Sequence, residues 1–210
     1  FGSCLRNIGD GSFPGDILAD KRGWLRTMRE YIQTLEVSER DIRLFREFCL
    51  FLRHFTLSKT ELENGELLDA HSHIMTAVHH WAKIAVIESG AQPDTALWKQ
   101  VRPINAGIYK IYEELSSSAE TLEQRVRLAH LACDFSVLSK MKSYCRPLLR
   151  LLASRQEPWS AAELLNVPEL APMRDELQLV LKKLANRSLV REVLVACDPG
   201  CEALELRYTS

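Results

Sequence analysis

Four of the six histidines of this chain lie within ten positions, in the stretch LLDAHSHIMTAVHHWAKIAVIE at residues 67–88. Imidazole binds metals, exchanges protons near neutral pH and forms hydrogen bonds, so such a cluster invites a chemical interpretation. The apolar spacing predicts a helix here. Its turn places three polar residues on one face, which Glu88 continues: Asp69, His73 and His80. His71 falls on or beside the apolar face.

A metal site is the first interpretation to weigh. It requires three or four ligands that converge on one point. His73 and His80 are about 10 Å apart along the helix axis, so one helix cannot close such a site. We therefore expect no metal, and two interpretations stay open. The histidines are packed side chains with structural hydrogen bonds, or they line a polar face that binds a ligand or another domain.

Other motifs are short or incomplete. Arg125 and His130 form R-x4-H, a spacing that occurs in the helical HEPN-type ribonucleases. Gly15 and Asp16 suggest the carboxylate pair that holds Mg²⁺ against nucleotide phosphates, but Leu18 occupies the second acidic position. The pair is therefore incomplete. The sequence contains no phosphate-binding glycine loop, HExxH motif or GxSxG motif.

The composition is that of an ordinary globular protein. The 210 residues are 46% hydrophobic and 26% charged, and the net charge of −1 creates no global field that would attract nucleic acid or membranes. Apolar runs are too short to span a bilayer. The six cysteines are sparse, which favours reduced thiols and a cytoplasmic location. Cys197 and Cys201 flank a turn without a histidine nearby and predict no zinc site.

The first 146 residues predict a mainly α fold. Glycines in residues 1–20 argue against a stable helix there. Residues 21–146 read as five or six helices packed as a bundle. We expect a helix break with an N-cap at Ser38, a helix from Thr60 to Ser89 closed by Gly90, and a helix start at Pro103. A long helix is expected over residues 120–144, with an apolar set that includes Leu128, Leu131 and Phe135.

Residues 147–210 predict a small α+β domain, a winged helix-turn-helix. Three short helices, the second with a capping box of Ser160 and Glu163, precede two strands around an Asp-Pro-Gly turn. The third helix exposes side chains that can contact base edges and phosphates: Arg174, Gln178, Lys182 and Asn186. Yet this segment holds 8 Lys and Arg against 9 Asp and Glu. DNA binding and protein docking are therefore equally open for it.

Three stretches carry a family resemblance. They are GDILADKRGWLRTMREYI, then LLDAHSHIMTAVHHWAKIAVIESG, then LWKQVRPINAGIYKIYEEL. Together they resemble the bacterial nucleotidyltransferase-like family, in which a nucleotidyltransferase-like domain precedes a helical substrate-binding domain and a terminal helix-turn-helix domain. The resemblance covers most of residues 15–210. The helical part is similar in kind to the C-terminal domain of kanamycin nucleotidyltransferase.

The resemblance implies that substrate binding and nucleotide binding belong to different domains. Residues 1–20 would be the remnant of, or a linker from, an upstream nucleotidyltransferase-like domain. That partner domain would hold the nucleotide and Mg²⁺, so this chain alone should need no cofactor and lack transferase activity. Asp69, His73 and His80 would contact the substrate, and Glu88 would be the general base toward an acceptor hydroxyl. Glu113 and Glu114 compete for that role.

Two further functions remain open. The chain can be a transcription regulator whose bundle senses a ligand or forms a homodimer while the winged helix binds DNA. It can also be a ribonuclease that uses Arg125 and His130. We expect no membrane partner. The acceptor substrate cannot be named from the sequence.

Overall fold

The computed structural model describes the backbone of residues 24–196 and 204–209, and the side chains from Glu39 onward within these ranges. The chain divides into two units, residues 1–38 and 39–210. The side-chain contacts that follow all lie in the second unit. The expectations for residues 1–20, for Cys197 and Cys201 and for the Asp-Pro-Gly turn lie outside the described residues.

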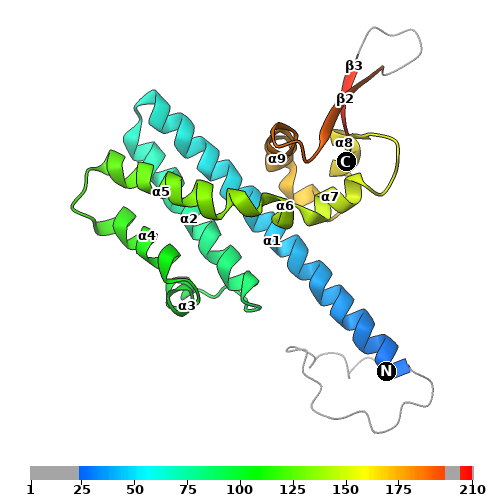
Figure 1. Ribbon diagram of the computed structural model, residues 1–210, viewed down its shortest axis with the longest axis horizontal. Coiled ribbons are helices and arrows are strands. Elements are labelled where there is room, and N and C mark those ends of the chain that lie inside the picture. The colour runs from blue at the N-terminus through cyan, green and yellow to red at the C-terminus, as the bar shows by residue number, and fades with distance from the viewer. Residues whose placement is uncertain (1–23, 197–203, 210) are drawn as a thin grey trace. The chain divides into compact units, whose positions relative to one another are not determined.

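Two long helices form the centre of this unit (Figure 1). Helix α1 (Trp24–Asn64) continues through Ser38, so the expected break there is wrong. The sequence has no glycine or proline between Gly23 and Gly65 to interrupt it. Gly65, with φ of 86°, makes the turn into α2 (Leu67–Glu88), which replaces the predicted start at Thr60. Gly90 closes α2 with φ of 87°, as predicted.

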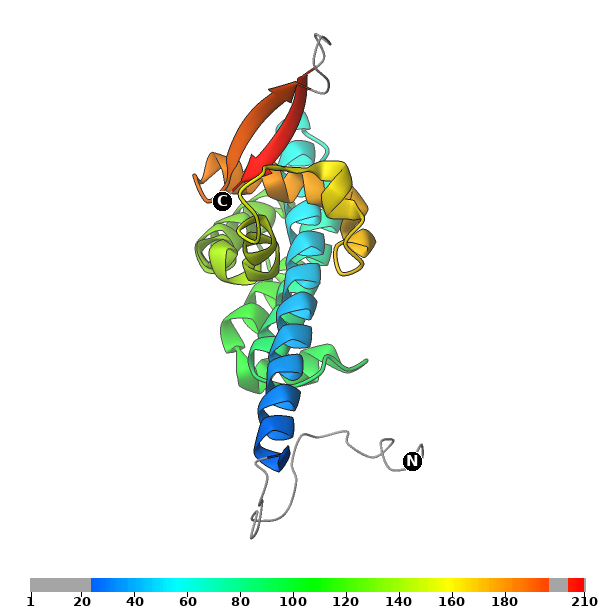
Figure 2. The same cartoon turned by 90° about the vertical axis from the view of Figure 1, so that its right-hand side faces the viewer.

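Three helices cover α2. They are α3 (Leu97–Ile104), α4 (Ala106–Ser117) and α5 (Leu122–Ser136), and each contacts α2. Pro103 lies inside α3 rather than at a helix start, because the Asn105 side chain accepts the Ile108 amide and caps α4 instead. Thr121 and Gln124 form a capping box at the start of α5. Figure 2 shows the helices from a second direction.

The long helix expected over residues 120–144 is interrupted. Helix α5 ends at Ser136, and a 3₁₀ turn η1 (Leu138–Lys140) leads into α6 (Met141–Tyr144) and α7 (Arg146–Leu152). The Ser139 hydroxyl donates a hydrogen bond to the Ser136 carbonyl. This bond satisfies a carbonyl in the last turn of α5, where the helical hydrogen bonds end.

Aromatic side chains of α1 fill the core. Phe51 and Phe55 stack with ring centroids 5.5 Å apart, and Phe48 meets Tyr144 of α6 at the same distance. Three free cysteines are buried among them: Cys49, Cys133 and Cys145. Among the described residues, no helix combines the length and apolar character that crossing a lipid bilayer requires.

A small antiparallel sheet follows the helices. Its strands are β1 (Trp159–Ser160), β2 (Arg191–Ala196) and β3 (Leu204–Thr209), in the spatial order β1-β3-β2. Between β1 and β2 come α8 (Ala161–Leu165), a 3₁₀ turn η2 (Ala171–Met173) and α9 (Arg174–Asn186). The capping box of Ser160 and Glu163 is present, as predicted. The mainly α fold with a small sheet is thus confirmed.

Polar contacts join α9 and its C-terminal end to the helices before it. Arg53 of α1 donates to the Glu176 carboxylate at 2.9 Å, and Arg187, just after α9, donates to the Leu138 carbonyl at 2.7 Å. Four apolar residues of α9 are buried: Leu177, Val180, Leu181 and Leu184.

Candidate functional site

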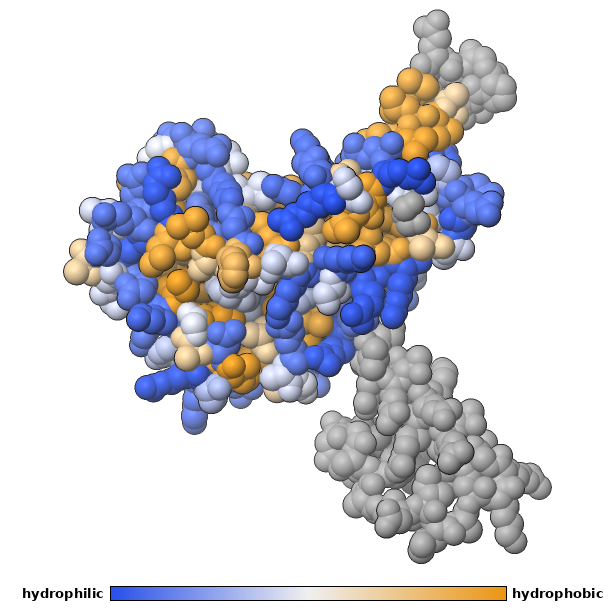
Figure 3. Space-filling view, viewed as in Figure 1, coloured by the Kyte–Doolittle hydropathy of each residue, from blue (hydrophilic) through white to orange (hydrophobic). Residues whose placement is uncertain are grey.

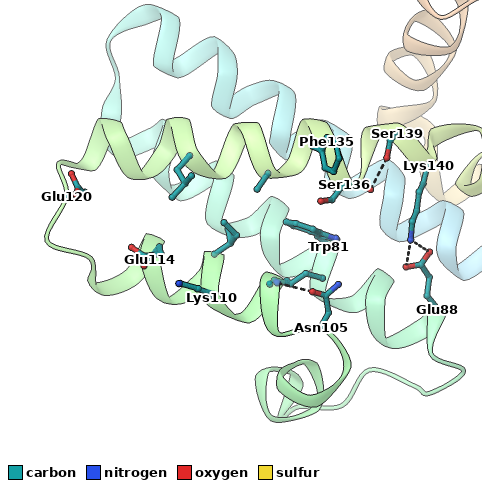
Figure 4. Close-up of a pocket in the computed structure, with 15 residues that line it drawn as sticks. Trp81, Glu88, Asn105, Lys110, Glu114, Glu120, Phe135, Ser136, Ser139 and Lys140 are labelled. Atoms are coloured by element: carbon teal, nitrogen blue, oxygen red, sulfur yellow. Dashed lines mark hydrogen bonds and ion pairs between the residues drawn. The ribbon is translucent and has the colours of Figure 1, made fainter.

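A groove of about 890 Å³ lies between α2, α4 and the end of α5. Its middle is apolar and its ends are polar, as Figure 4 shows. Trp81 and Phe135 lie in the middle, with aliphatic side chains of the three helices around them: Ile108, Ile111, Leu128 and Ala132. In Figure 3 hydrophobic side chains gather over this region of α4 and α5.

The apolar residues of α5 are exposed to an unusual degree. Phe135 is 83% exposed, Leu131 is 68% exposed and Leu128 is 47% exposed. These three residues belong to the apolar set expected for the long helix over residues 120–144. Their three- and four-residue spacing puts them on one face of α5, and this face is turned to solvent. Clustered apolar exposure of this kind is typical of binding surfaces.

Glu88 marks one end of the groove. Lys140 lies 3.0 Å and 3.2 Å from its two carboxylate oxygens, and the Tyr144 hydroxyl donates to it at 3.1 Å. Burial first, and then the Glu88 charge, raise the pKa of the Tyr144 hydroxyl, so it stays a donor. Arg40 donates to the carbonyls of Ile87 and Glu88 at the end of α2. The position of the Glu88 backbone is therefore fixed.

The opposite end of the groove carries Lys110, Glu114 and Glu120 (Figure 4). Its two carboxylates can accept hydrogen bonds from amines or hydroxyls of a ligand. Glu113 is exposed and does not line the groove. A ligand in this groove would meet charged groups at both ends and hydrocarbon between them.

The predicted substrate-contacting histidines lie elsewhere on α2, against α1. His80 Nδ1 lies 2.7 Å from a Glu47 carboxylate oxygen, and His73 Nδ1 lies 3.2 Å from His54 Nδ1. Burial raises the pKa of Glu47, but the His80 hydrogen bond and the Lys83 charge outweigh it and lower the pKa overall. Burial, followed by the charges of the other two histidines, lowers the pKa of His54. These contacts hold α1 against α2.

The remaining residues of the stretch have separate neighbours. Asp69 is exposed, and the hydrogen bond that the structure gives His73 is with His54. His71 bonds to the Leu115 carbonyl at 3.0 Å, and the His79 ring meets Trp98 edge to face at 6.1 Å between centroids. The structure thus places Glu88 in the groove and leaves Asp69, His73 and His80 outside it.

A metal site needs several ligands that converge on one point. In the part of the chain that the structure describes, no three His, Cys, Asp or Glu side chains converge so as to hold a metal ion. The described side chains therefore offer no ligand set for Mg²⁺.

The R-x4-H pair is enclosed by the bundle. His130 is 7% exposed and its Nε2 lies 2.8 Å from the Ser58 hydroxyl, while Arg125 donates to the Leu115 carbonyl at 3.0 Å. Burial first, and then the Lys59 charge, lower the pKa of His130 to about 4. RNA has no access to this histidine, which argues against the ribonuclease hypothesis.

Helix α9 presents its four predicted polar residues to solvent. Arg174, Gln178, Lys182 and Asn186 are all exposed, opposite the buried apolar face. This exposure makes all four side chains accessible to a binding partner.

Sequence reasoning missed three residues that shape the groove: Trp81, Phe135 and Lys140. Trp81 is buried and directly follows His80 in the sequence. His80 lies on the face of α2 that contacts α1, whereas Trp81 lines the groove. Lys140 lies beyond the end of α5, and only the interruption at Ser136 brings it to Glu88. The signal that could have revealed Phe135 is the excess of apolar residues on α5 over what one buried face needs.

Comparison with known proteins gives the domain an assignment. Residues 41–140 match the family described as the YgxA-like substrate binding domain. The uncharacterized protein YgxA of Bacillus subtilis (strain 168) is 31% identical over 185 residues, which are 88% of this chain and 63% of YgxA. The chain thus spans less than two thirds of the length of that relative.

A solved structure agrees with this match. It is the crystal structure of a nucleotidyltransferase-like protein from Exiguobacterium sibiricum 255-15, which is 28% identical and superposes with a TM-score of 0.77. The similarity covers 93% of this chain and 67% of that one. This chain therefore contains a YgxA-like substrate-binding domain at residues 41–140 and is homologous to YgxA, which is consistent with a nucleotidyltransferase-like family.

Proposed function

We propose that the groove between α2, α4 and α5 holds the acceptor substrate of a nucleotidyl-transfer reaction. The observation that carries this proposal is the location of the groove. Every residue that lines it falls within residues 41–140, the range that matches the substrate-binding family. The exposed side chains of Leu128 and Phe135, which line the groove, supply the binding energy, because a ligand would remove them from water.

In this proposal the chain is the substrate-binding and winged-helix portion of a nucleotidyltransferase-like protein. Transfer would need a nucleotidyltransferase-like partner domain that holds the nucleotide and Mg²⁺, so the chain by itself is catalytically incomplete. Its buried free cysteines support a reducing, cytoplasmic setting.

Glu88 is the proposed general base. Its carboxylate lines the groove, and Lys140 and Tyr144 hold it in place there by hydrogen bonds. A base must come within hydrogen-bond distance of the proton that it removes. Glu114, at the other end of the groove, is the competing carboxylate. Substrate contact by Asp69, His73 and His80 stays a separate prediction, because none of the three lines this groove.

The test is a thermal-shift screen of hydroxyl-bearing small molecules, amino sugars included, against the 210-residue chain. Ala132→Trp places a large side chain in the groove and should abolish the shifts of any hit. Leu131→Trp changes the neighbouring residue of the same helix, outside the groove, and should keep them. Hits that survive Ala132→Trp unchanged would contradict the proposal.

A second function is supported by α9 and the sheet. The order α7, β1, α8, α9, β2, β3 with β1 paired to β3 is typical of a winged helix-turn-helix. We infer that α9 can enter a DNA groove through Arg174, Gln178 and Lys182, with the bundle as a ligand sensor or dimerising part. Selection of bound sequences from a random duplex pool tests this. An enriched motif that Gln178→Ala changes supports base contacts, and a pool without enrichment contradicts them.

A further inference from the structure

A second hollow of about 670 Å³ lies over η1, α6 and α7 and shares Ser139 and Lys140 with the groove. Four of its lining residues are cationic, and a serine lies among them: Lys140, Lys142, Arg146, Arg150 and Ser143. Its residues differ completely from the exposed residues of α9. In Figure 3 strongly hydrophilic side chains lie over this part of the chain.

The charges of this hollow are not balanced. Asp41 lies 3.7 Å from Arg146 and 3.8 Å from Arg150, beyond direct hydrogen-bond distance, and it is the one carboxylate that the structure pairs with both. Glu88 pairs with Lys140. Four cations thus face two carboxylates among the described residues, which leaves a surplus of two positive charges. The near-neutral whole chain conceals this local field.

The cations are regularly spaced. Lys142 lies on α6, and Arg146 and Arg150 follow at four-residue intervals on α7, which Cys145 separates from α6. Within α7, Arg146 and Arg150 lie one helical turn apart, about 6 Å along the axis, and all three cations line the same hollow. The side chains of Arg146 and Arg150 are 48% and 67% exposed.

These features indicate the class of ligand. A site for one small anion makes several donors converge in an enclosed pocket, whereas this hollow offers regularly spaced, exposed cations. A polymer with a phosphate at every nucleotide matches a series of this kind. Arginine, lysine and serine are the side chains that contact phosphate oxygens in nucleic acid complexes.

We propose that the η1–α6–α7 hollow binds the phosphodiester backbone of a nucleic acid, independently of base contacts by α9. The proposal goes beyond the substrate groove and does not depend on it. It assigns Lys142, Arg146 and Arg150 to phosphate contacts that carry no sequence information. Binding through this surface is electrostatic and weakens with salt.

The experiment measures fluorescence anisotropy of a labelled 20-base-pair duplex of arbitrary sequence, titrated with the 210-residue chain at 50 to 200 mM NaCl. The test variant combines Lys142→Gln, Arg146→Gln and Arg150→Gln. The matched control combines Arg43→Gln, Arg46→Gln and Lys99→Gln, which remove the same charge from exposed positions elsewhere. A third variant, Arg174→Gln with Lys182→Gln, changes α9 alone.

We expect the test variant to lose at least tenfold in affinity at 50 mM NaCl. Three lost phosphate contacts should lower the slope of log affinity against log salt by about 2.7. The control should stay within threefold of the parent. Arg146→Lys with Arg150→Lys keeps the charge and should retain binding, which excludes a folding defect as the cause of the loss.

Four outcomes would overturn the proposal. The parent chain binds no duplex at 50 mM NaCl, or the control variant loses as much as the test variant. The α9 variant alone loses binding, which would leave the α9 function standing without this one. The chain binds phosphatidylserine vesicles but no duplex, which would make the surface a membrane contact instead.

Discussion

Glu88 is the proposed general base and lines the groove, and its hydrogen bonds decide how it can be tested. Its ion pair with Lys140 is partly exposed, with side-chain exposures of 34% and 53%. Exposed pairs contribute about 0–1 kcal/mol. A residue with so small a structural contribution can be changed without unfolding the protein.

We expect Glu88→Gln to change the free energy of unfolding by less than about 1 kcal/mol, as measured by urea denaturation. Affinity for a groove ligand with an amine or hydroxyl near Glu88 should fall, because the charge is lost. Glu123→Gln, which removes the exposed pair with Arg127, is the matched control. A destabilisation by more than about 2 kcal/mol would make Glu88 a structural residue.

His130 predicts a pH dependence of stability. Its pKa is lowered from 6.5 to about 4 in the folded protein. Between pH 6.5 and pH 4 the unfolded chain binds a proton at this histidine and the folded protein does not. Protonation therefore favours unfolding, so the stability is full above pH 6.5 and is lost as the pH falls toward 4. The loss of urea midpoint between pH 7.5 and pH 5 should be smaller in His130→Gln than in the parent. An identical loss in both would assign the pH dependence to other groups.

The histidine stretch shows what a residue pattern can reveal. Its helix and the common face of His73 and His80 followed from spacing alone. The partners, His54 and Glu47, lie 19 and 33 residues away along the chain, and no local pattern encodes such contacts. The choice between a packed face and a binding face therefore depended on tertiary structure.

Helix ends were predictable where one residue type is required by the backbone. Ser160 with Glu163, and Gly90 after α2, were placed correctly because caps have strong side-chain signatures. Ser38 also has the cap residue type, but helix α1 continues through it. A cap residue type without a glycine or proline nearby does not by itself stop a helix.

Gly65 separates α1 from α2, where the sequence had predicted a helix start at Thr60 instead. The need for glycine at this turn can be tested directly. Gly65→Ala forces a side chain into a positive φ of 86° and should destabilise the protein by about 1–2 kcal/mol. Gly65→Asn should cost less, since asparagine tolerates this conformation better. Urea denaturation measures both. Equal stability of the alanine variant and the parent would show that the turn relaxes.

On the scale of the whole unit, an ion pair between Arg53 and Glu176 joins α1 to α9, and its two side chains differ in exposure. The Glu176 side chain is 5% exposed, whereas the Arg53 side chain is 45% exposed. Removing the arginine would strand a buried carboxylate, which costs more than the loss of a surface pair.

We therefore expect Arg53→Ala to destabilise the unit by about 1–3 kcal/mol and to speed amide hydrogen exchange in α9 more than in α4. Glu176→Gln in the same background should restore part of the loss, because it removes the stranded charge. Hydrogen exchange read by mass spectrometry measures both effects. Uniform acceleration across all helices would mean that the pair does not secure α9 in particular.

The buried cysteines have a practical consequence. Burial raises the pKa of the Cys49, Cys133 and Cys145 thiols, so each is both shielded and protonated in the folded state. An alkylating reagent needs an accessible thiolate. These three positions should therefore react only when the structure opens around them. After exposure to iodoacetamide, mass spectrometry of the separate peptides gives the alkylation rate at each cysteine. These three rates report how often the core opens around each position.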